Sequence, residues 1–198
     1  MNSNIFKAIH EFALSNSQMD DIHGFPHLER VFDLCMQIGT KLKANLKVLK
    51  VAALFHDIGR SKKDYTTTER HHADISADLA HNFLNSQEFG FSKEDIKNII
   101  HCIQSHSFSN HKKPKTLEAQ ILSDADKLDA IGAIGLYRTI GFTIKNNGNL
   151  NDVIKHLEEK IIKLKDMLLL DISRKIAEKR HKIVLEFYQQ IKIEANLD

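Results

Sequence analysis

Residues 46–59 read Leu-Lys-Val-Leu-Lys-Val-Ala-Ala-Leu-Phe-His-Asp-Ile-Gly and combine an apolar helical face with two polar side chains at its end. The three- and four-residue spacing of the apolar side chains predicts a helix. Asn45 suits its N-cap, and Gly59 suits a left-handed residue after its C-terminus. His56 ends the apolar face and is expected to point inward. Asp57 follows about 100° further around the helix, so both side chains are expected to reach one ion.

Helical spacing of apolar residues continues through nearly all of the chain. The 198 residues include only two prolines and eight glycines, and no segment alternates as a half-buried strand does. We therefore expect an all-α protein. Before the C-terminal region, helices are expected around residues 5–12, 26–38, 46–56, 75–83, 93–103 and 117–136.

The C-terminal region begins at the clearest turn signal of the chain, Asn-Asn-Gly-Asn at residues 146–149. Two long, charged, amphipathic helices over residues 153–170 and 172–193 are expected to pack as a pair. Small residues crowd the middle of the preceding helix, and we expect another backbone to approach it closely there. The whole chain, 1–198, is expected to form one domain, with a core at about 20–140 and C-terminal helices at about 151–195.

Composition limits the partners that we expect. The 28 basic and 26 acidic residues nearly cancel, so no strong overall field attracts the chain to nucleic acid or to a membrane. Cys35 and Cys102 lie on apolar helical stripes and are expected to be reduced core thiols, as is typical of a cytoplasmic protein. The first residues run into an amphipathic segment and not into a basic stretch followed by a long apolar run, so neither secretion nor membrane spanning is expected. The absence of a glycine-rich phosphate loop excludes P-loop ATPase chemistry.

Four residues form a candidate metal-binding set, namely His27, His56, Asp57 and Asp126. Two imidazoles and two carboxylates suit a divalent transition metal, and four ligands on an ion that prefers six leave room for water and a phosphate oxygen. His27 alone would more commonly be read as a histidine at a helix start. Asp57 alone would be a carboxylate at a helix C-terminus, which the helix dipole disfavours. A bound cation removes that objection.

These residues, in their order and context, resemble the HD-domain metal-dependent phosphohydrolases. The closer likeness is to the small single-domain bacterial members and spans roughly residues 20–195. It implies an HD-domain helical bundle with one divalent ion, Mn²⁺, Mg²⁺, Co²⁺ or similar, held by His27, His56, Asp57 and Asp126. The ion would polarise a phosphoryl oxygen and lower the pKa of a water molecule.

The resemblance also suggests which residues act around the ion. Asp57 lies nearest the attacking water and is expected to assist its deprotonation, and His72 is expected to handle a proton. Arg60, His106 and Arg138 are expected to contact phosphate groups, since a guanidinium can bind two oxygens at once. HD relatives with a glutamate shortly after the His-Asp pair use it near this water. Arg60 and Ser61 stand there in this chain, so the general base stays open.

Two further residues are expected to support the site without touching the ion. Arg30 is one turn beyond His27 and would brace a site carboxylate. Asp129 would hold a histidine or an arginine by a charge-assisted hydrogen bond. Asp124, in contrast, is about 200° around the helix from Asp126 and is expected at the surface. Related subgroups recruit extra histidines for a second ion, which leaves a two-ion centre as an alternative.

The substrate implied by the resemblance is a nucleotide or another small phosphate ester, with no nucleic acid and no membrane as partner. The favoured reaction is cleavage of a nucleoside triphosphate, preferably a deoxynucleotide, to monophosphate and pyrophosphate. Three alternatives stay open, namely a nucleotide monophosphatase, a phosphodiesterase of a signalling nucleotide, and a non-catalytic metal- and nucleotide-binding sensor. The sequence indicates no oligomeric state.

Overall fold

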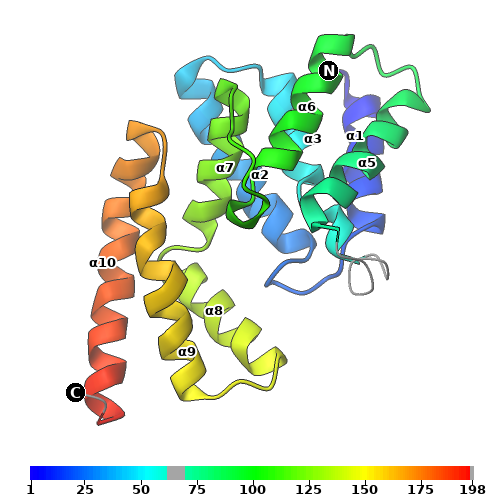
Figure 1. The fold of residues 1–198 in the computed structure, drawn as a ribbon. Coiled ribbons are helices and arrows are strands. Elements are labelled where there is room, and N and C mark those ends of the chain that lie inside the picture. The colour runs from blue at the N-terminus through cyan, green and yellow to red at the C-terminus, as the bar shows by residue number, and fades with distance from the viewer. Residues whose placement is uncertain (62–69, 197–198) are drawn as a thin grey trace. The chain divides into compact units, whose positions relative to one another are not determined.

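The computed structural model describes residues 1–61 and 70–196, and every regular element within these ranges is helical (Figure 1). The prediction of an all-α protein is therefore confirmed. The chain divides into two compact units, residues 1–125 and residues 126–198. None of the described helices combines the length and the apolar character that crossing a membrane requires.

The first unit carries most of the predicted helices. In chain order it contains α1 (Ser3–Ser15), α2 (Phe25–Leu42), α3 (Leu46–Phe55), η1 (Ile58–Ser61), α5 (His72–Asn85), α6 (Lys93–Ser105), η2 (Phe108–Asn110) and the start of α7 (Leu117–Asp129). Helix α3 packs against α1, α2, α5 and α6 (Figure 1). Its residues 51–55 are all buried, so the end of α3 brings His56 and Asp57 into the interior of this unit.

Capping side chains fix where several of these helices begin. Asn45 accepts hydrogen bonds from the backbone N–H groups of Lys47 and Val48, as its position predicted. Ser92 and Asp95 form a reciprocal capping box at the start of α6. Helix α2 begins at Phe25, after Gly24, with Pro26 in its first turn. His27 therefore lies in the opening turn of α2, which confirms its predicted placement.

Gly59 does not have the left-handed conformation that the sequence predicted. It lies within the short helix η1 and has no positive φ. Its N–H donates to Ser76 Oγ at 2.9 Å, and a Cβ at this position would lie only 2.7 Å from the carbonyl oxygen of His72. The glycine is thus required for the close approach of α5 to η1, which places His72 beside Asp57.

The second unit contains the expected C-terminal helices. After the last residues of α7 follow α8 (Ala133–Lys145), α9 (Leu150–His156), the π turn η3 (Leu157–Ile161), the 3-10 turn η4 (Ile162–Met167) and α10 (Asp171–Glu194). Helix α10 packs against α9 and η4 and runs back along them (Figure 1). The predicted C-terminal pair is confirmed, although its first member is not a regular α-helix.

Two predicted helices are interrupted for identifiable reasons. The helix expected over residues 117–136 ends at Asp129, and α8 starts after Gly132, which has φ +94°. A Cβ on Gly132 would lie 3.0 Å from Cβ of Arg180, so the predicted close approach does occur. In the segment 153–170, buried Val153, Leu157 and Ile161 follow one another at four-residue steps. Such steps exceed the 3.6 residues of an α-helical turn, and the wider π turn keeps these side chains on one side.

Candidate metal centre

Two helix ends in the first unit bring three potential metal ligands together. His27 comes from the first turn of α2, and His56 and Asp57 follow directly after α3. All three side chains are buried. The two Nε2 atoms are 3.2 Å apart, and Asp57 Oδ2 lies 3.9 Å from Nε2 of His27 and 4.0 Å from Nε2 of His56. One donor atom from each residue can therefore face a single ion.

A backbone hydrogen bond prepares His56 for this role. Its Nδ1 lies 2.7 Å from the carbonyl oxygen of Ala53. A carbonyl oxygen can only accept, so Nδ1 carries the proton and donates it. In the neutral ring, Nε2 then keeps its lone pair and directs it toward His27 and Asp57. Metal-binding histidines are commonly oriented by such a contact at the other ring nitrogen.

A second group of donors shares Asp57 with the first. His72 opens α5 and His106 follows the end of α6, and both are buried. Their Nε2 atoms lie 3.2 Å and 3.4 Å from Asp57 Oδ1. Nδ1 of His106 donates to the carbonyl oxygen of Ile103 at 2.6 Å, which again leaves Nε2 with its lone pair. The sequence predicted that His72 handles a proton and that His106 contacts phosphate, and the structure places both beside Asp57.

Asp57 is held in its charged form by its surroundings. Burial by itself raises the pKa of this carboxyl, but the Arg60 guanidinium, together with His72, His56 and His106, outweighs burial and holds the pKa well below its usual range. Arg60 Nε donates to Asp57 Oδ2 at 2.6 Å. The buried Oδ1 atom accepts no hydrogen bond from any described residue. A charged, incompletely bonded carboxylate beside histidine lone pairs has the chemistry of a divalent-cation ligand set.

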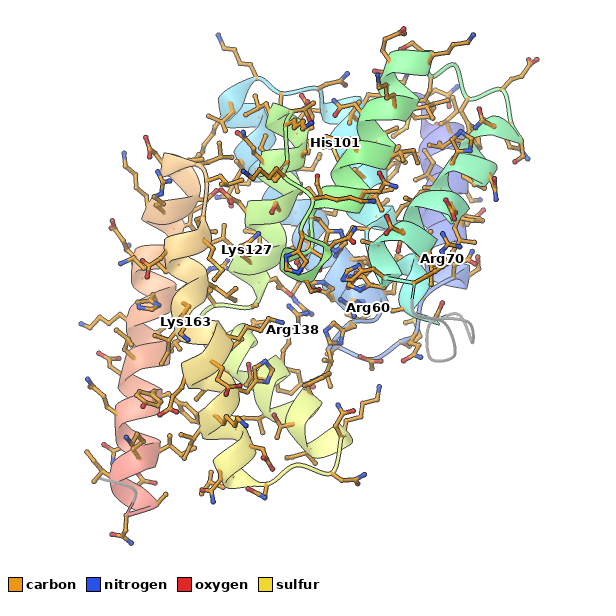
Figure 2. All side chains as sticks on the ribbon, viewed as in Figure 1. Arg60, Arg70, His101, Lys127, Arg138 and Lys163 are labelled. Carbon is orange, nitrogen blue, oxygen red and sulfur yellow. The ribbon has the colours of Figure 1, made fainter. Side chains whose placement is uncertain are left out.

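Arg60 also binds His72. Its Nη2 donates to His72 Nε2 at 2.9 Å, and burial lowers the pKa of His72, which favours the neutral ring. The predicted contact of Arg60 with a phosphate would require this side chain to release both partners. Figure 2 labels Arg60 on the short turn that precedes α5.

Asp126, Asp129 and Arg138 belong to the second unit. Asp126 is half-buried, and its role as the fourth metal ligand stays a prediction. Asp129 and Arg138 form a buried ion pair, in which Arg138 Nη1 donates to Asp129 Oδ2 at 2.8 Å. Asp129 thus holds an arginine, which Figure 2 labels on α8. The predicted contact of Arg138 with phosphate is not tested by this ion pair.

Asp124 contradicts its predicted surface position. Its side chain is fully buried, and residues 121–125 around it are buried as well. The prediction assumed that α7 has a solvated face, but this part of the helix has none. Arg30 donates from Nη2 to the backbone carbonyl of Asp21 at 2.9 Å, so it secures the loop before α2. Its predicted support of a site carboxylate stays a prediction.

Several residues that orient the site were not identified from the sequence. The carbonyls of Ala53 and Ile103 each lie three residues before a site histidine, and the position of both histidines at helix ends was the available signal. His71 has no such signal. It accepts from the N–H of Ala73 as the N-cap of α5, and its Nε2 contacts Ser109 Oγ at 2.7 Å. It thereby ties the segment after α6 to the start of α5.

An all-helical protein with buried histidine and aspartate donors at helix ends has the features of a metal-dependent hydrolase. The family model of the HD domain matches residues 24–131. The chain therefore belongs to the HD-domain family, and it is a metal-dependent phosphohydrolase. The predicted family and class of enzyme are both confirmed.

Relatives and solved structures support this assignment over most of the chain. The uncharacterized protein YpgQ of Bacillus subtilis is 34% identical over 177 residues, which cover 85% of this chain and 82% of YpgQ. The crystal structure of YpgQ in complex with ADP is similar with a TM-score of 0.76 at 30% identity, covering 96% of this chain and 97% of that one. A Lactobacillus plantarum protein gives a TM-score of 0.81 at 28% identity, with both chains fully covered. A predicted HD superfamily hydrolase from an uncultured Thermotogales bacterium gives 0.70 at 27% identity, covering 95% of this chain and 91% of that one.

Proposed function

We propose that this phosphohydrolase acts on nucleotides and cleaves a nucleoside triphosphate, preferably a deoxynucleotide, to monophosphate and pyrophosphate. The proposal assigns His27, His56, Asp57 and Asp126 as ligands of one divalent ion. The observation that carries it is the buried cluster of His27, His56 and Asp57, whose donor atoms converge on one point. An ion held there would supply Lewis acidity to a phosphoryl oxygen and to the attacking water.

A nucleotide is the favoured substrate because of a relative. YpgQ, at 30% identity over nearly its whole length, has been crystallised in complex with ADP. A fold that accommodates a nucleoside diphosphate in that protein supports a nucleotide substrate in this one. The net charge of +2 gives no support for a nucleic-acid polymer as the substrate, since such binding depends on extended basic surfaces.

The remaining polar side chains suit handling of protons and phosphate charge. Asp57 stays charged and lies nearest the proposed ion, so it can accept a hydrogen bond from the attacking water. His72 has a lowered pKa, which suits a residue that takes up a proton and then releases it. Neutral His106 presents a lone pair at Nε2, so its contact with a phosphate oxygen would require a second proton on the ring. Arg138 remains our candidate for a guanidinium contact with phosphate.

Hydrolysis in ¹⁸O-labelled water tests the cleavage position. Purified protein is loaded with Mn²⁺, Mg²⁺ or Co²⁺ and incubated with deoxynucleoside and ribonucleoside triphosphates, and the products are analysed by mass spectrometry. We expect the label in the nucleoside monophosphate, because water would attack the α-phosphorus and pyrophosphate would leave. The His56→Ala, Asp57→Ala double variant is the control and is expected to be inactive.

Other outcomes separate the alternatives. Label found only in inorganic phosphate, together with a nucleoside diphosphate, would refute the proposed cleavage position but not the metal centre. Release of phosphate from a nucleoside monophosphate alone would indicate a monophosphatase, and turnover of a cyclic or bridged nucleotide alone would indicate a phosphodiesterase. Nucleotide binding without turnover, with every divalent ion, would indicate a sensor.

A further inference from the structure

Arg60 places a permanent positive charge beside the second donor group, which consists of Asp57, His72 and His106. Its Nε donates to Asp57 Oδ2 at 2.6 Å, and its Nη2 donates to His72 Nε2 at 2.9 Å. A guanidinium has only donors and stays protonated in proteins. Within the second donor group it therefore binds the imidazole nitrogen of His72 that a divalent cation would need. The Asp57 oxygen that it binds, Oδ2, faces His27 and His56, whereas Oδ1 faces His72 and His106.

The second donor group otherwise has the composition of a cation site. One donor atom from each of its three buried residues lies within 4.8 Å of the others. His72 Nε2 accepts a hydrogen bond from Arg60, and His106 donates from Nδ1 to Ile103. In their neutral forms, neither ring can therefore donate from Nε2 to Asp57 Oδ1, which accepts no hydrogen bond from a described residue. Three electron-rich atoms facing one another inside a protein require a positive charge nearby.

We infer that Arg60 takes the place of a second divalent cation and thereby limits this centre to one metal ion. The inference rests on the proposed function, because the first donor group, His27, His56 and Asp57, must hold the first ion. A second ion would need the lone pair of His72 Nε2, which Arg60 already occupies. It would also lie within a few ångströms of a guanidinium of the same sign, where the repulsion is strong at low dielectric.

Removal of the guanidinium should therefore open the second donor group to metal. Arg60→Gln removes the charge and keeps a polar side chain, whereas Arg60→Met keeps an unbranched apolar side chain without the charge. Arg60→Lys retains a positive charge and should still exclude a second ion. Arg70→Gln is the matched control, since Arg70 is an exposed arginine whose ion-pair partner is Asp78 and not a donor of either group.

The experiment measures bound metal per chain. Each full-length variant is stripped with a chelator, reloaded with Mn²⁺, desalted and analysed for metal, and folding is checked by circular dichroism. We expect about one ion per chain in the wild type, Arg60→Lys and Arg70→Gln, and about two in Arg60→Gln and Arg60→Met, since each donor group can hold one ion. Electron paramagnetic resonance should then show an exchange-coupled manganese pair only in the last two variants.

A double variant, Arg60→Gln with His72→Ala, identifies where the extra ion binds. Adding His72→Ala to Arg60→Gln should return the content to about one ion, because the second donor group loses a ligand. Folded Arg60→Gln or Arg60→Met protein that still binds one ion would overturn the inference and leave the first metal site standing. Two ions in the wild type would also overturn it. If the wild type bound no ion, the proposed metal centre would be refuted, and the proposed role of Arg60 would be refuted as well.

Discussion

Asp124 and Asp126 are only two residues apart on α7, yet their environments differ. Asp124 is fully buried, whereas Asp126 is half-buried. Their spacing separates their directions by about 200° around the helix, and only Asp126 corresponds to the motif that predicts a metal ligand. Substitution of each by asparagine therefore separates a loss of metal chemistry from a loss of stability.

We expect Asp126→Asn to lower turnover by about 100-fold or more, because loss of a ligand should exceed the 10- to 100-fold effects typical of residues behind ligands. Its melting temperature without metal should stay near that of the wild type. Asp124→Asn should instead cost about 1 to 3 kcal/mol of stability, since it alters a buried polar group. Steady-state kinetics and thermal unfolding of both variants provide the measurement. An active Asp126→Asn beside a folded, inactive Asp124→Asn would show that the wrong carboxylate was assigned.

His71 should make stability depend on pH. Burial is the main cause that lowers the pKa of His71 from 6.5 to about 4, and the nearby Arg60 guanidinium adds to it. The unfolded chain thus binds a proton on His71 below about pH 6.5, whereas the folded chain does so only below about pH 4. Its contribution to stability should therefore fall as the pH is lowered from 6.5 to about 4 and level off below that.

The His71→Asn variant isolates this effect, because asparagine can still cap α5 but does not titrate. Urea midpoints of wild type and variant are compared between pH 4 and pH 7. The difference between the two proteins should shift in favour of the variant as the pH falls. Parallel pH profiles would show that His71 does not couple protonation to folding.

Whether the position of a residue could be predicted depended on whether neighbouring residues in the sequence determine it. The positions of His27, His56 and Asp57 at helix ends could be predicted, because the sequence marks these ends with a cap, a proline or an apolar face. The convergence of His72 and His106 on Asp57 could not be predicted from spacing, since it depends on how α5 and α6 pack. Asp124 was misplaced because its burial depends on what covers α7 and not on the residues of α7 itself.

At the scale of helices, the contact between η1 and α5 depends on Gly59. We expect Gly59→Ala to cost about 1 to 3 kcal/mol, the usual range for overpacking, because its Cβ would meet backbone atoms of His72 and Ser76 at 2.7 Å. Turnover should fall as well, since His72 would move away from Asp57. Urea unfolding and kinetics measure the two effects.

Gly90→Asn is the matched control for Gly59→Ala. Gly90 has φ +65°, and a Cβ added there would meet no described atom within 4 Å. Asparagine tolerates this conformation better than other residues with a side chain do. The stability and turnover of this variant should stay near wild type. Equal effects of the two substitutions would mean that the approach of α5 to η1 does not depend on the absence of a side chain at Gly59.

Helix starts were more predictable than helix interruptions. Asn45 and the pair of Ser92 and Asp95 cap α3 and α6 through contacts within three residues, so the sequence alone contains that information. The break at Gly132 accompanies a close approach by Arg180, which lies far along the chain. The π turn after α9 depends on which apolar side chains are buried, and the 3.6-residue pattern did not predict it.

At the scale of the whole molecule, metal binding should contribute to stability. The donors converge only in the folded chain, so an ion that binds them stabilises the folded state. Adding Mn²⁺ to the chelator-treated protein at a free concentration one hundred times its Kd should add about 2.7 kcal/mol. Thermal unfolding with and without Mn²⁺ measures this shift. The His56→Ala, Asp57→Ala double variant should show none, and an equal shift in that variant would place the stabilising ion elsewhere.

The donors of the candidate metal centre come from the start of α2, the end of α3, the start of α5 and the end of α6. Their contacts join residues that are distant along the chain, and such contacts carry a large loop-closure cost that slows their formation during folding. If the contacts between these donors form after the folding transition state, a bound ion lowers the free energy of the native state but not that of the transition state. Metal would then leave the refolding rate unchanged and slow unfolding, so that it lengthens the lifetime of each folded molecule.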